Sequence, residues 1–322
     1  MSEKTGISWT DHTFNPWWGC TKVSPACDHC YAERDAKRFA PMMALWGVGR
    51  ERRTFGDEHW KAPMRWAKTM PAKLGRRPRV FCASMGDWLD LDAPLGEFVR
   101  LLDLIRRTPE LDWLLLSKRV GNCRHRLGEA LNASESVSLR EWIALWLNDD
   151  APANVWLGAT VINQTEADRD IPKLLDVPAR VRFLSIEPML GPITVEHATD
   201  LGGPGTIDWV IAGGESGPHA RPAHPDWFRA LRDECEAFGV PFHFKQWGEH
   251  SPGELAPHPS YPGDESAWRV DQIGRRWHDP MESTKLRSEW EPIKFSRPGK
   301  KLAGRLLDGR THDDFPRCHI RA

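Results

Sequence analysis

Six short apolar runs at a nearly regular interval restrict the fold of this chain more than any other feature. Runs of this length and composition are typical of buried parallel strands. Successive runs begin 33, 42, 27, 27 and 32 residues apart, near the ~30 residues of a strand–helix–strand unit. The six starts are Val80, Trp113, Val155, Arg182, Trp209 and Pro241. We predict an α/β fold, a full or partial (β/α) barrel of about six to seven parallel strands.

The intervals between these runs carry the apolar periodicity of helices. Each expected helix has start or stop residues where they belong, such as proline at the first turn and glycine after the last. The apolar faces are Leu95 to Ile105 after Pro94, Leu139 to Trp146 after a Ser138 cap, and Trp227 to Phe238 between Pro225 and Gly239.

The composition changes at about Glu249, where the chain becomes rich in proline, glycine and histidine. We therefore predict a barrel domain over residues 1–248 and a loop-rich extension over 249–322 that packs on it. The stretch "GKKLAGRLLDGRTHDDFP" carries one short helical pattern, and both a lid and a structural tail are compatible with it.

Cellular location is read from what the sequence lacks. No apolar run approaches the ~20 residues that cross a bilayer, and the first residues have no apolar signal core. Seven cysteines is an odd number, which argues against a disulfide framework. We expect a cytoplasmic protein without a membrane partner.

Charge is distributed unevenly despite a formal net charge of −1. Residues Glu33 to Arg79 contain 13 Lys/Arg against 5 Asp/Glu, whereas Val80 to Gly263 contain 16 against 27. The basic segment would suit nucleic acid, nucleotides or other phosphates; a solvated face is the other interpretation.

Polar side chains follow each of the six expected strands. In parallel α/β folds, ligands bind beyond the carboxyl ends of the strands, so we predict one shared cleft there. Its residues are Ser84, Gly86, Asp87, Ser117, Lys118, Arg119, Thr160, Asn163, Gln164, Ser185, Glu187, Gly213, Gly214, Glu215, Ser216, Lys245 and Gln246.

Three cysteines, Cys20, Cys27 and Cys30, lie before these strands with the spacing C-x6-C-x2-C. Such a thiol trio suits zinc or an iron–sulfur cluster, because both prefer sulfur ligands. Structural zinc takes four protein ligands, and His29 or His12 could supply the fourth. On a four-iron cluster, three cysteines leave one iron open for chemistry. Spacing alone does not decide between these metals.

The cysteine loop, with Tyr31 directly after Cys30, resembles the cluster loop of the radical S-adenosylmethionine superfamily. The commonest spacing there is C-x3-C-x2-C, and this chain has three extra residues between the first two cysteines. Seven ordered stretches, among them "SWTDHTFNPWWGCTKVSPACDHCYAE", "SMGDW", "RFLSIEPMLGPI" and "IAGGESGPHARP", resemble a phage-associated three-cysteine family of unknown function.

The resemblance implies a [4Fe-4S] cluster held by the three cysteines, with S-adenosyl-L-methionine (SAM) at the open iron. The superfamily binds the SAM amino group with a "GGE"-like segment after the second strand, a place taken here by "SMGD". It therefore assigns Ser84, Gly86 and Asp87 to the methionine moiety. From their places at the strand ends, Arg119 could pair with the SAM carboxylate, Thr160, Asn163 and Gln164 could bind ribose or carboxylate, and Gly213, Gly214 and Glu215 suit adenosine or substrate. A helix start at Asn163 and a plain turn at the "GGE" segment are the competing interpretations.

Glu187 and Lys245 are the expected catalytic residues, which would orient substrate or transfer a proton. With Lys118 and Arg119 they are the charged residues expected to face the cavity, and mutual ion pairing at the barrel mouth is the competing interpretation. Trp17 and Trp18, just before Cys20, are expected to shield a cluster from water.

The leading hypothesis from the resemblance is a radical enzyme with flavodoxin or ferredoxin as reductant. Bound SAM would be cleaved to a 5'-deoxyadenosyl radical that abstracts hydrogen from a substrate, for which a nucleic-acid base or nucleoside is one candidate class. One alternative is a barrel enzyme of another class with a structural cluster. A second is a non-catalytic, zinc-stabilised nucleic-acid-binding protein that contacts phosphates through Arg50, Arg52, Arg53, Arg76, Arg77 and Arg79.

Overall fold

The computed structural model describes residues 5–39, 44–195, 206–252, 269–270, 276–277 and 295–316. The chain forms two compact units, each described by itself below. The first unit comprises Met1–Thr160, Asp170–Phe183 and Gly203–Ile207, and the second comprises Val161–Arg169, Leu184–Gly202 and Asp208–Ala322.

A seven-stranded sheet with the strand order β1 to β7 is the main structure of the described residues. Its strands are β1 (His12–Thr13), β2 (Arg79–Cys82), β3 (Asp112–Ser117), β4 (Val155–Thr160), β5 (Val181–Ile186), β6 (Trp209–Gly213) and β7 (Phe242–Gln246). The predicted α/β class is confirmed, in its partial-barrel form. All six expected strands are present, and β1 adds a seventh.

Strand pairing in the first unit is parallel throughout β1 to β4. Val80 aligns with His12 of β1 and Trp113 of β3, and Trp113 aligns in turn with Val155 of β4. Nearly every residue of β3 and β4 is buried, as expected of strands covered on both faces. Packing requires glycine at position 158 in β4, because a Cβ there would lie 2.3 Å from the ring of Phe183.

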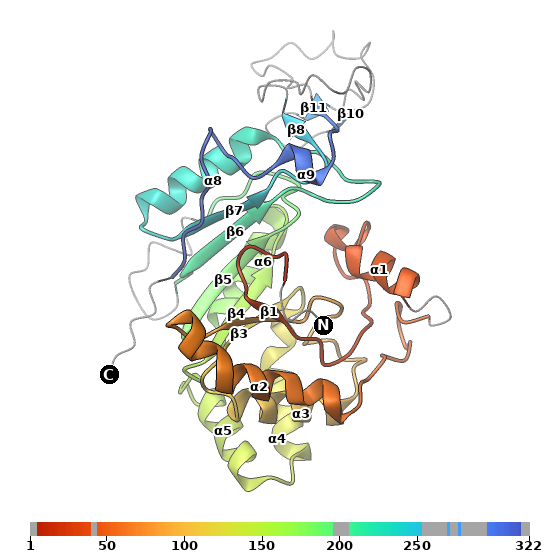
Figure 1. The fold of residues 1–322 in the computed structure, drawn as a ribbon, viewed down its shortest axis with the longest axis vertical. Helices are drawn as coiled ribbons and strands as arrows, with labels where there is room; N and C mark the ends of the chain where they lie inside the picture. The colour runs from red at the N-terminus through yellow and green to blue at the C-terminus, as the bar shows by residue number, and fades with distance from the viewer. Residues whose placement is uncertain are drawn as a thin grey trace. The chain divides into compact units, whose positions relative to one another are not determined.

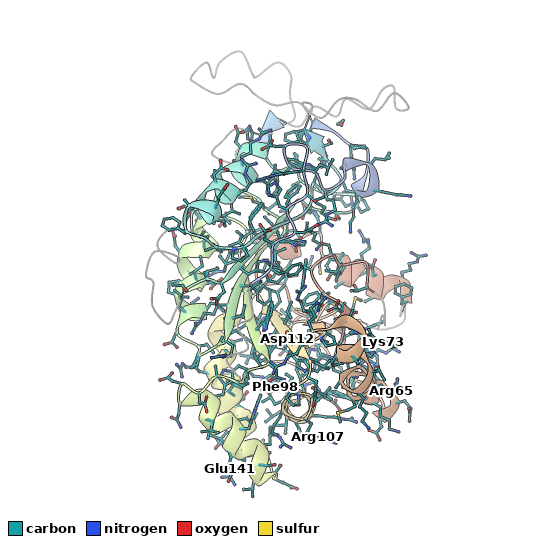
Figure 2. The ribbon with its side chains drawn as sticks, turned by 60° about the vertical axis from the view of Figure 1, so that its left-hand side comes forward. Arg65, Lys73, Phe98, Arg107, Asp112 and Glu141 are labelled. Atoms are coloured by element: carbon teal, nitrogen blue, oxygen red, sulfur yellow. The ribbon has the colours of Figure 1, made fainter. Side chains whose placement is uncertain are left out.

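Helices α2 (Asp57–Leu74), α3 (Leu95–Arg106), α4 (Cys123–Ala133) and α5 (Val137–Leu147) pack against one another in chain order beside this part of the sheet (Figure 1). Figure 2 labels exposed Arg65 and Lys73 on α2, Arg107 directly after α3 and Glu141 on α5, together with the buried Phe98 of α3 and Asp112 of β3. The predicted Ser138 cap is wrong: the cap lies two residues earlier, at Ser136, whose Oγ accepts from Leu139 N at 3.4 Å.

In the second unit, β6 and β7 pair in parallel and α8 (Pro225–Ala237) packs on β7. The sequence predicted α8 correctly, with its proline at the first turn and Gly239 just beyond its end. Helix α6 (Gln164–Leu175) begins in this unit and ends in the first.

The C-terminal segment that the structure describes runs along β7. Phe244 N donates to His312 O at 3.0 Å, and Trp209 Nε1 donates to Asp314 O at 2.8 Å. This segment contains α9 (Lys300–Ala303), and β8 (Ser251–Pro252) pairs with β11 (Phe295–Ser296). A loop-rich extension is thus confirmed for this segment, whereas a boundary at residue 248 stays a prediction.

A two-stranded pair, β9 (Arg269–Val270) and β10 (Arg276–Trp277), completes the described elements of the extension. Most of the proline-rich stretch after Pro252 lies outside the described residues. Among the helices that are described, none is both long enough and apolar enough to cross a bilayer.

Candidate functional site

The cysteine loop, residues 15–31, is attached to the chain beyond β2 immediately before its first cysteine. Gly19 forms a parallel bridge with Gly86. A Cβ on Gly86 would lie 3.1 Å from Gly19 O, so the glycine permits this close backbone approach. On the next residue, Cys20 O accepts from Gly47 N at 3.0 Å. The backbone of Cys20 is therefore held by two neighbouring segments of the first unit.

The two later cysteines lie at the ends of short elements. Cys27 ends a 3-10 helix, η1 (Pro25–Cys27), which Ser24 caps by accepting from Ala26 N at 3.1 Å. Cys30 directly precedes α1 (Tyr31–Phe39). Local backbone structure thus determines where both thiols lie in the loop.

The three thiols form no disulfide bond. Within the described residues, no three His, Cys, Asp or Glu side chains lie close enough together to share one metal ion. His12, a proposed fourth zinc ligand, is buried in β1 with its ring stacked on Trp66, 4.4 Å between centroids.

An arginine with little solvent exposure contacts the first cysteine. Arg119, just beyond β3, donates from Nη1 to Cys20 Sγ at 3.4 Å and to Asp87 Oδ2 at 2.9 Å. Its Nη2 donates to Thr21 O. Two predicted site residues, Asp87 and Arg119, therefore meet as an ion pair beside a predicted metal ligand.

Asp87 is held by several donors besides Arg119. Its Oδ1 accepts from Ser117 Oγ at 2.7 Å and from Leu89 N at 3.0 Å, and its Oδ2 accepts from Lys118 N at 3.0 Å. Buried carboxylates need such partners. The ends of β2 and β3 are thus joined through one carboxylate.

Burial raises the pKa of the Cys20 thiol to about 12, and the negative charge of Asp87 acts in the same direction. Arg119 opposes both, because its positive charge and hydrogen bond lower the pKa of Cys20. The metal-free thiol is therefore protonated at neutral pH, and coordination of a metal would release that proton.

A second arginine, Arg52, is buried and holds the segment beside the loop. It donates to Asp90 Oδ2 at 2.8 Å, to Thr21 Oγ1 at 2.9 Å and to Asp92 Oδ2 at 3.1 Å. Its Nη1 also donates to backbone carbonyls, including Leu45 O at 3.2 Å. The prediction that Arg52 contacts phosphates is wrong, because its side chain is fully buried and paired with carboxylates.

Two other arginines from the predicted phosphate-binding set already have protein partners. Arg76 forms a bidentate ion pair with Asp11, with N–O distances of 2.8 and 2.9 Å. The Arg53 guanidinium lies 4.9 Å from the ring centroid of Trp18. Trp17, by contrast with Trp18, is completely buried.

Asn15 is a site residue that the sequence interpretation missed. Its Oδ1 accepts from Met85 N at 2.7 Å, and its Nδ2 donates to Ser84 Oγ at 3.0 Å. His59 donates from Nε2 to Asn15 O at 2.8 Å. Asn15 thus joins the cysteine loop to the "SMGD" segment, and its place in the "NPWWGC" stretch was the available signal.

Tyr31, the aromatic residue after the last cysteine, makes a second connection to the same segment. Its hydroxyl donates to Ser84 O at 2.9 Å. Ser84 and Gly86 of the predicted site therefore lie against the cysteine loop, with Asp87 next to them in the chain.

In the second unit, the two predicted catalytic residues form an ion pair. Lys245 Nζ lies 3.0 Å from Glu187 Oε1 and 3.1 Å from Oε2, and Ser185 Oγ donates to Oε2 at 3.4 Å. A Cβ on Gly213 would lie 2.8 Å from Glu187 Oε1. The structure therefore brings Glu187, Lys245 and Gly213 together.

The "GGE" segment has close partners within the same unit. Glu215 is buried and accepts two hydrogen bonds from the Arg221 guanidinium, at 2.8 and 2.6 Å. A Cβ on Gly214 would lie 1.8 Å from Trp247 O, so the backbone of this segment requires glycine. These contacts explain the motif by packing, and its cofactor role stays a prediction.

The remaining predicted positions are Thr160 and Asn163. Thr160 ends β4 and is buried. Asn163 Oδ1 accepts from Glu166 N at 3.0 Å, the geometry of a helix N-cap. Thr160 belongs to the first unit and Asn163 to the second. The predicted residues are therefore divided between the two units, and a single cleft across all six strand ends stays a prediction.

Comparison with known proteins gives a family but no activity. No curated protein matches. The similar solved structures include a spore photoproduct lyase double mutant with bound AdoMet and dinucleoside spore photoproduct, at 11% identity and a TM-score of 0.39, which covers 86% of this chain and 71% of that one. Another mutant of that lyase matches at 10% identity and a TM-score of 0.38, over 89% and 75%. Likeness at this level carries no functional argument.

The profile of the family described as "Protein of unknown function (DUF5131)" matches residues 4–316, and the chain belongs to that family.

Proposed function

We propose that this protein is a radical SAM enzyme in which Cys20, Cys27 and Cys30 hold a [4Fe-4S] cluster. The observation that carries the proposal is the cysteine loop itself, with three free thiols within eleven residues. The first thiol lies beside a guanidinium, and the preceding residue, Gly19, bridges to Gly86 in the segment after β2. The resemblance to the superfamily's cluster loop motivates this choice of metal.

The donor set suits this group by its chemistry. Thiolates are the usual ligands of iron–sulfur clusters, and three of them leave one iron for a further ligand. When bound, such a cluster supplies the electron that cleaves SAM to methionine and a 5'-deoxyadenosyl radical, which abstracts hydrogen from the substrate. The protein's own contribution is position, exclusion of water and charge.

The segment after β2 is proposed to receive the methionine part of SAM. Gly86 leaves room for a close backbone approach, and Ser84 and Asp87 supply oxygen acceptors for an ammonium group. Fully buried Trp17, three residues before Cys20, would limit access of water to the metal.

Glu187 and Lys245 are proposed to orient the substrate or carry a proton. Their ion pair keeps a carboxylate and an ammonium within 3.0 Å, so a proton could pass between them without a large movement of either side chain. Thr160, Asn163, Gly213, Gly214 and Glu215 complete the proposed binding set for the nucleoside part of SAM and the substrate.

A nucleic-acid base or nucleoside is the proposed substrate class, and the basic segment from Glu33 to Arg79 supports it through its excess of cations. A flavodoxin or ferredoxin is the proposed reductant, and the cytoplasm the proposed compartment. Phage association stays a prediction from the resemblance.

Anaerobic reconstitution with iron and sulfide tests the proposal directly. A brown protein with about four irons per chain, which forms 5'-deoxyadenosine from SAM after reduction by dithionite, is the expected result. Cys27→Ala should abolish the product, whereas Cys235→Ala removes a thiol in α8 and should leave it unchanged. A colourless protein with one bound zinc would instead support the non-catalytic alternative.

A further inference from the structure

We infer that Arg119 is a positioning residue for the metal centre: with Asp87 it forms a charge pair that acts on the Cys20 sulfur and sets the reduction potential of the cluster. The inference rests on the proposed function. It differs from the role expected from the sequence, in which Arg119 pairs with the SAM carboxylate.

The contacts of Arg119 fix its orientation. Its Nη1 carries two hydrogens and has two partners, Cys20 Sγ at 3.4 Å and Asp87 Oδ2 at 2.9 Å. Its backbone N donates to Ser117 Oγ at 2.8 Å, and that same hydroxyl donates to Asp87. Ser117 Oγ therefore links the backbone of Arg119 to Asp87, the residue that pairs with its guanidinium.

Burial makes these charges effective. The side chain of Arg119 is 10% exposed and that of Asp87 is 6% exposed, so water screens them weakly. Cys20 is a predicted metal ligand whose sulfur accepts a hydrogen bond from this cation, at 3.4 Å. Hydrogen bonds and charge at the sulfurs are what tune the potential of such clusters.

The sign of each effect follows from charge. Reduction adds a negative charge to the cluster, which a nearby guanidinium stabilises and a nearby carboxylate opposes. Loss of Arg119 leaves Asp87 uncompensated, so the potential should fall. Loss of the charge on Asp87 leaves Arg119 uncompensated, so the potential should rise.

The test is a redox titration of reconstituted protein, followed by EPR of the reduced cluster. Arg119→Gln should make reduction at least tenfold less favourable, which is a fall of 59 mV for a one-electron couple. Asp87→Asn keeps a side-chain oxygen for its donors and should shift the potential upward. Arg119→Lys, which keeps the charge, should stay closer to wild type than Arg119→Gln.

Arg126 in α4 provides a matched control. It is also buried, but its partners are Glu129, the carbonyl of Ala93 and the ring of Phe98. Arg126→Gln should leave the potential unchanged. A loss of packing would shift the variants at 87 and 119 in the same direction, which would overturn the inference.

The two proposals fail in different ways. Wild-type protein that takes up no iron and sulfide overturns the proposed function. Wild-type protein that holds the cluster, with an unchanged potential in both Arg119→Gln and Asp87→Asn, overturns the role of Arg119 alone. Iron content and circular dichroism of each variant show that the compared proteins are folded and loaded.

Discussion

Two arginines, one fully buried and one 10% exposed at its side chain, lie beside the cysteine loop and serve it differently. Arg52 and Arg119 both pair with aspartates beyond β2, and both reach Thr21 in the loop. The hydrogen bonds of Arg52 all end on oxygen atoms, whereas Arg119 also donates to the sulfur of Cys20. The same residue type therefore stabilises the backbone at one position and acts on a reactive atom at the other.

Charge balance explains the difference. Arg52 lies between two carboxylates, Asp90 and Asp92, and donates to several backbone carbonyls, so its charge is fully compensated within the protein. Arg119 has one carboxylate partner, Asp87, and its Nη1 also donates a hydrogen bond to the Cys20 sulfur. A guanidinium with a single counterion can stabilise additional negative charge at a neighbouring sulfur.

The largest expected effect is the loss of Arg52. Arg52→Ala should lower the free energy of unfolding by about 3–5 kcal/mol, because it leaves buried Asp90 without its cation. Urea unfolding followed by circular dichroism measures this change. Arg100→Ala removes a partly exposed arginine paired with exposed Asp57, and it should cost below about 1 kcal/mol. Equal losses in the two variants would contradict the structural role of Arg52.

Gly19 lies beside Arg52 and provides a second test of the structural role of this arginine. Its φ is +116°, and a Cβ would lie 2.5 Å from Leu45 O and 2.9 Å from Arg52 Cδ. Gly19→Ala should cost about 2–3 kcal/mol through backbone strain and this clash, and it should reduce iron uptake by displacing Cys20. Gly6→Ala, where a Cβ meets nothing within 4 Å, is the control and should match wild type in both measurements.

The strands were predictable because burial on both faces leaves a continuous apolar signal. Strand β1 was not predicted, because its two residues are too few to show a pattern of apolar residues. Helix α2 was not predicted either, because Pro63 and Pro71 lie inside it and proline normally indicates a helix end.

The site was predictable only where its residues follow a local pattern in the sequence. The cysteine spacing identified a metal candidate, and the strand ends identified Asp87 and Arg119. The contacts of Arg52 with Asp90 and of Asn15 with Met85 join positions 38 and 70 residues apart. Such pairs depend on the tertiary structure, so no local pattern could reveal them.

Loss of Arg119 should cost less stability than loss of Arg52, which is the direct test of the comparison. Asp87 keeps three other donors when Arg119 is removed, from Ser117, Lys118 and Leu89. Arg119→Gln should therefore lower the free energy of unfolding by about 1–2 kcal/mol. Urea unfolding of the metal-free protein measures it. A loss as large as that of Arg52→Ala would show that both arginines are structural.

Asp112 gives the smallest expected effect and shows what a buried aspartate does without a close arginine. It begins β3 (Figure 2), and its Oδ1 lies 3.7 Å from Arg77 Nη1, farther than Asp87 and Asp90 lie from their cations. Burial raises the pKa of Asp112 to about 6, although Arg77 and Arg79 oppose the rise. Its ionised form therefore destabilises the folded state.

The sign of the pH dependence follows from this raised pKa. The destabilising contribution is fully present above about pH 6 and vanishes as the pH falls below ~3.9, the ordinary value for an unfolded chain. Asp112→Asn should thus increase the free energy of unfolding by about 1 kcal/mol at pH 7.5, with a gain that shrinks towards pH 4. Urea unfolding at both pH values measures the gain. A loss of stability at pH 7.5 would mean that the distant Arg77 pair outweighs the burial of the Asp112 charge, and that close pairing is not what distinguishes Asp87 and Asp90.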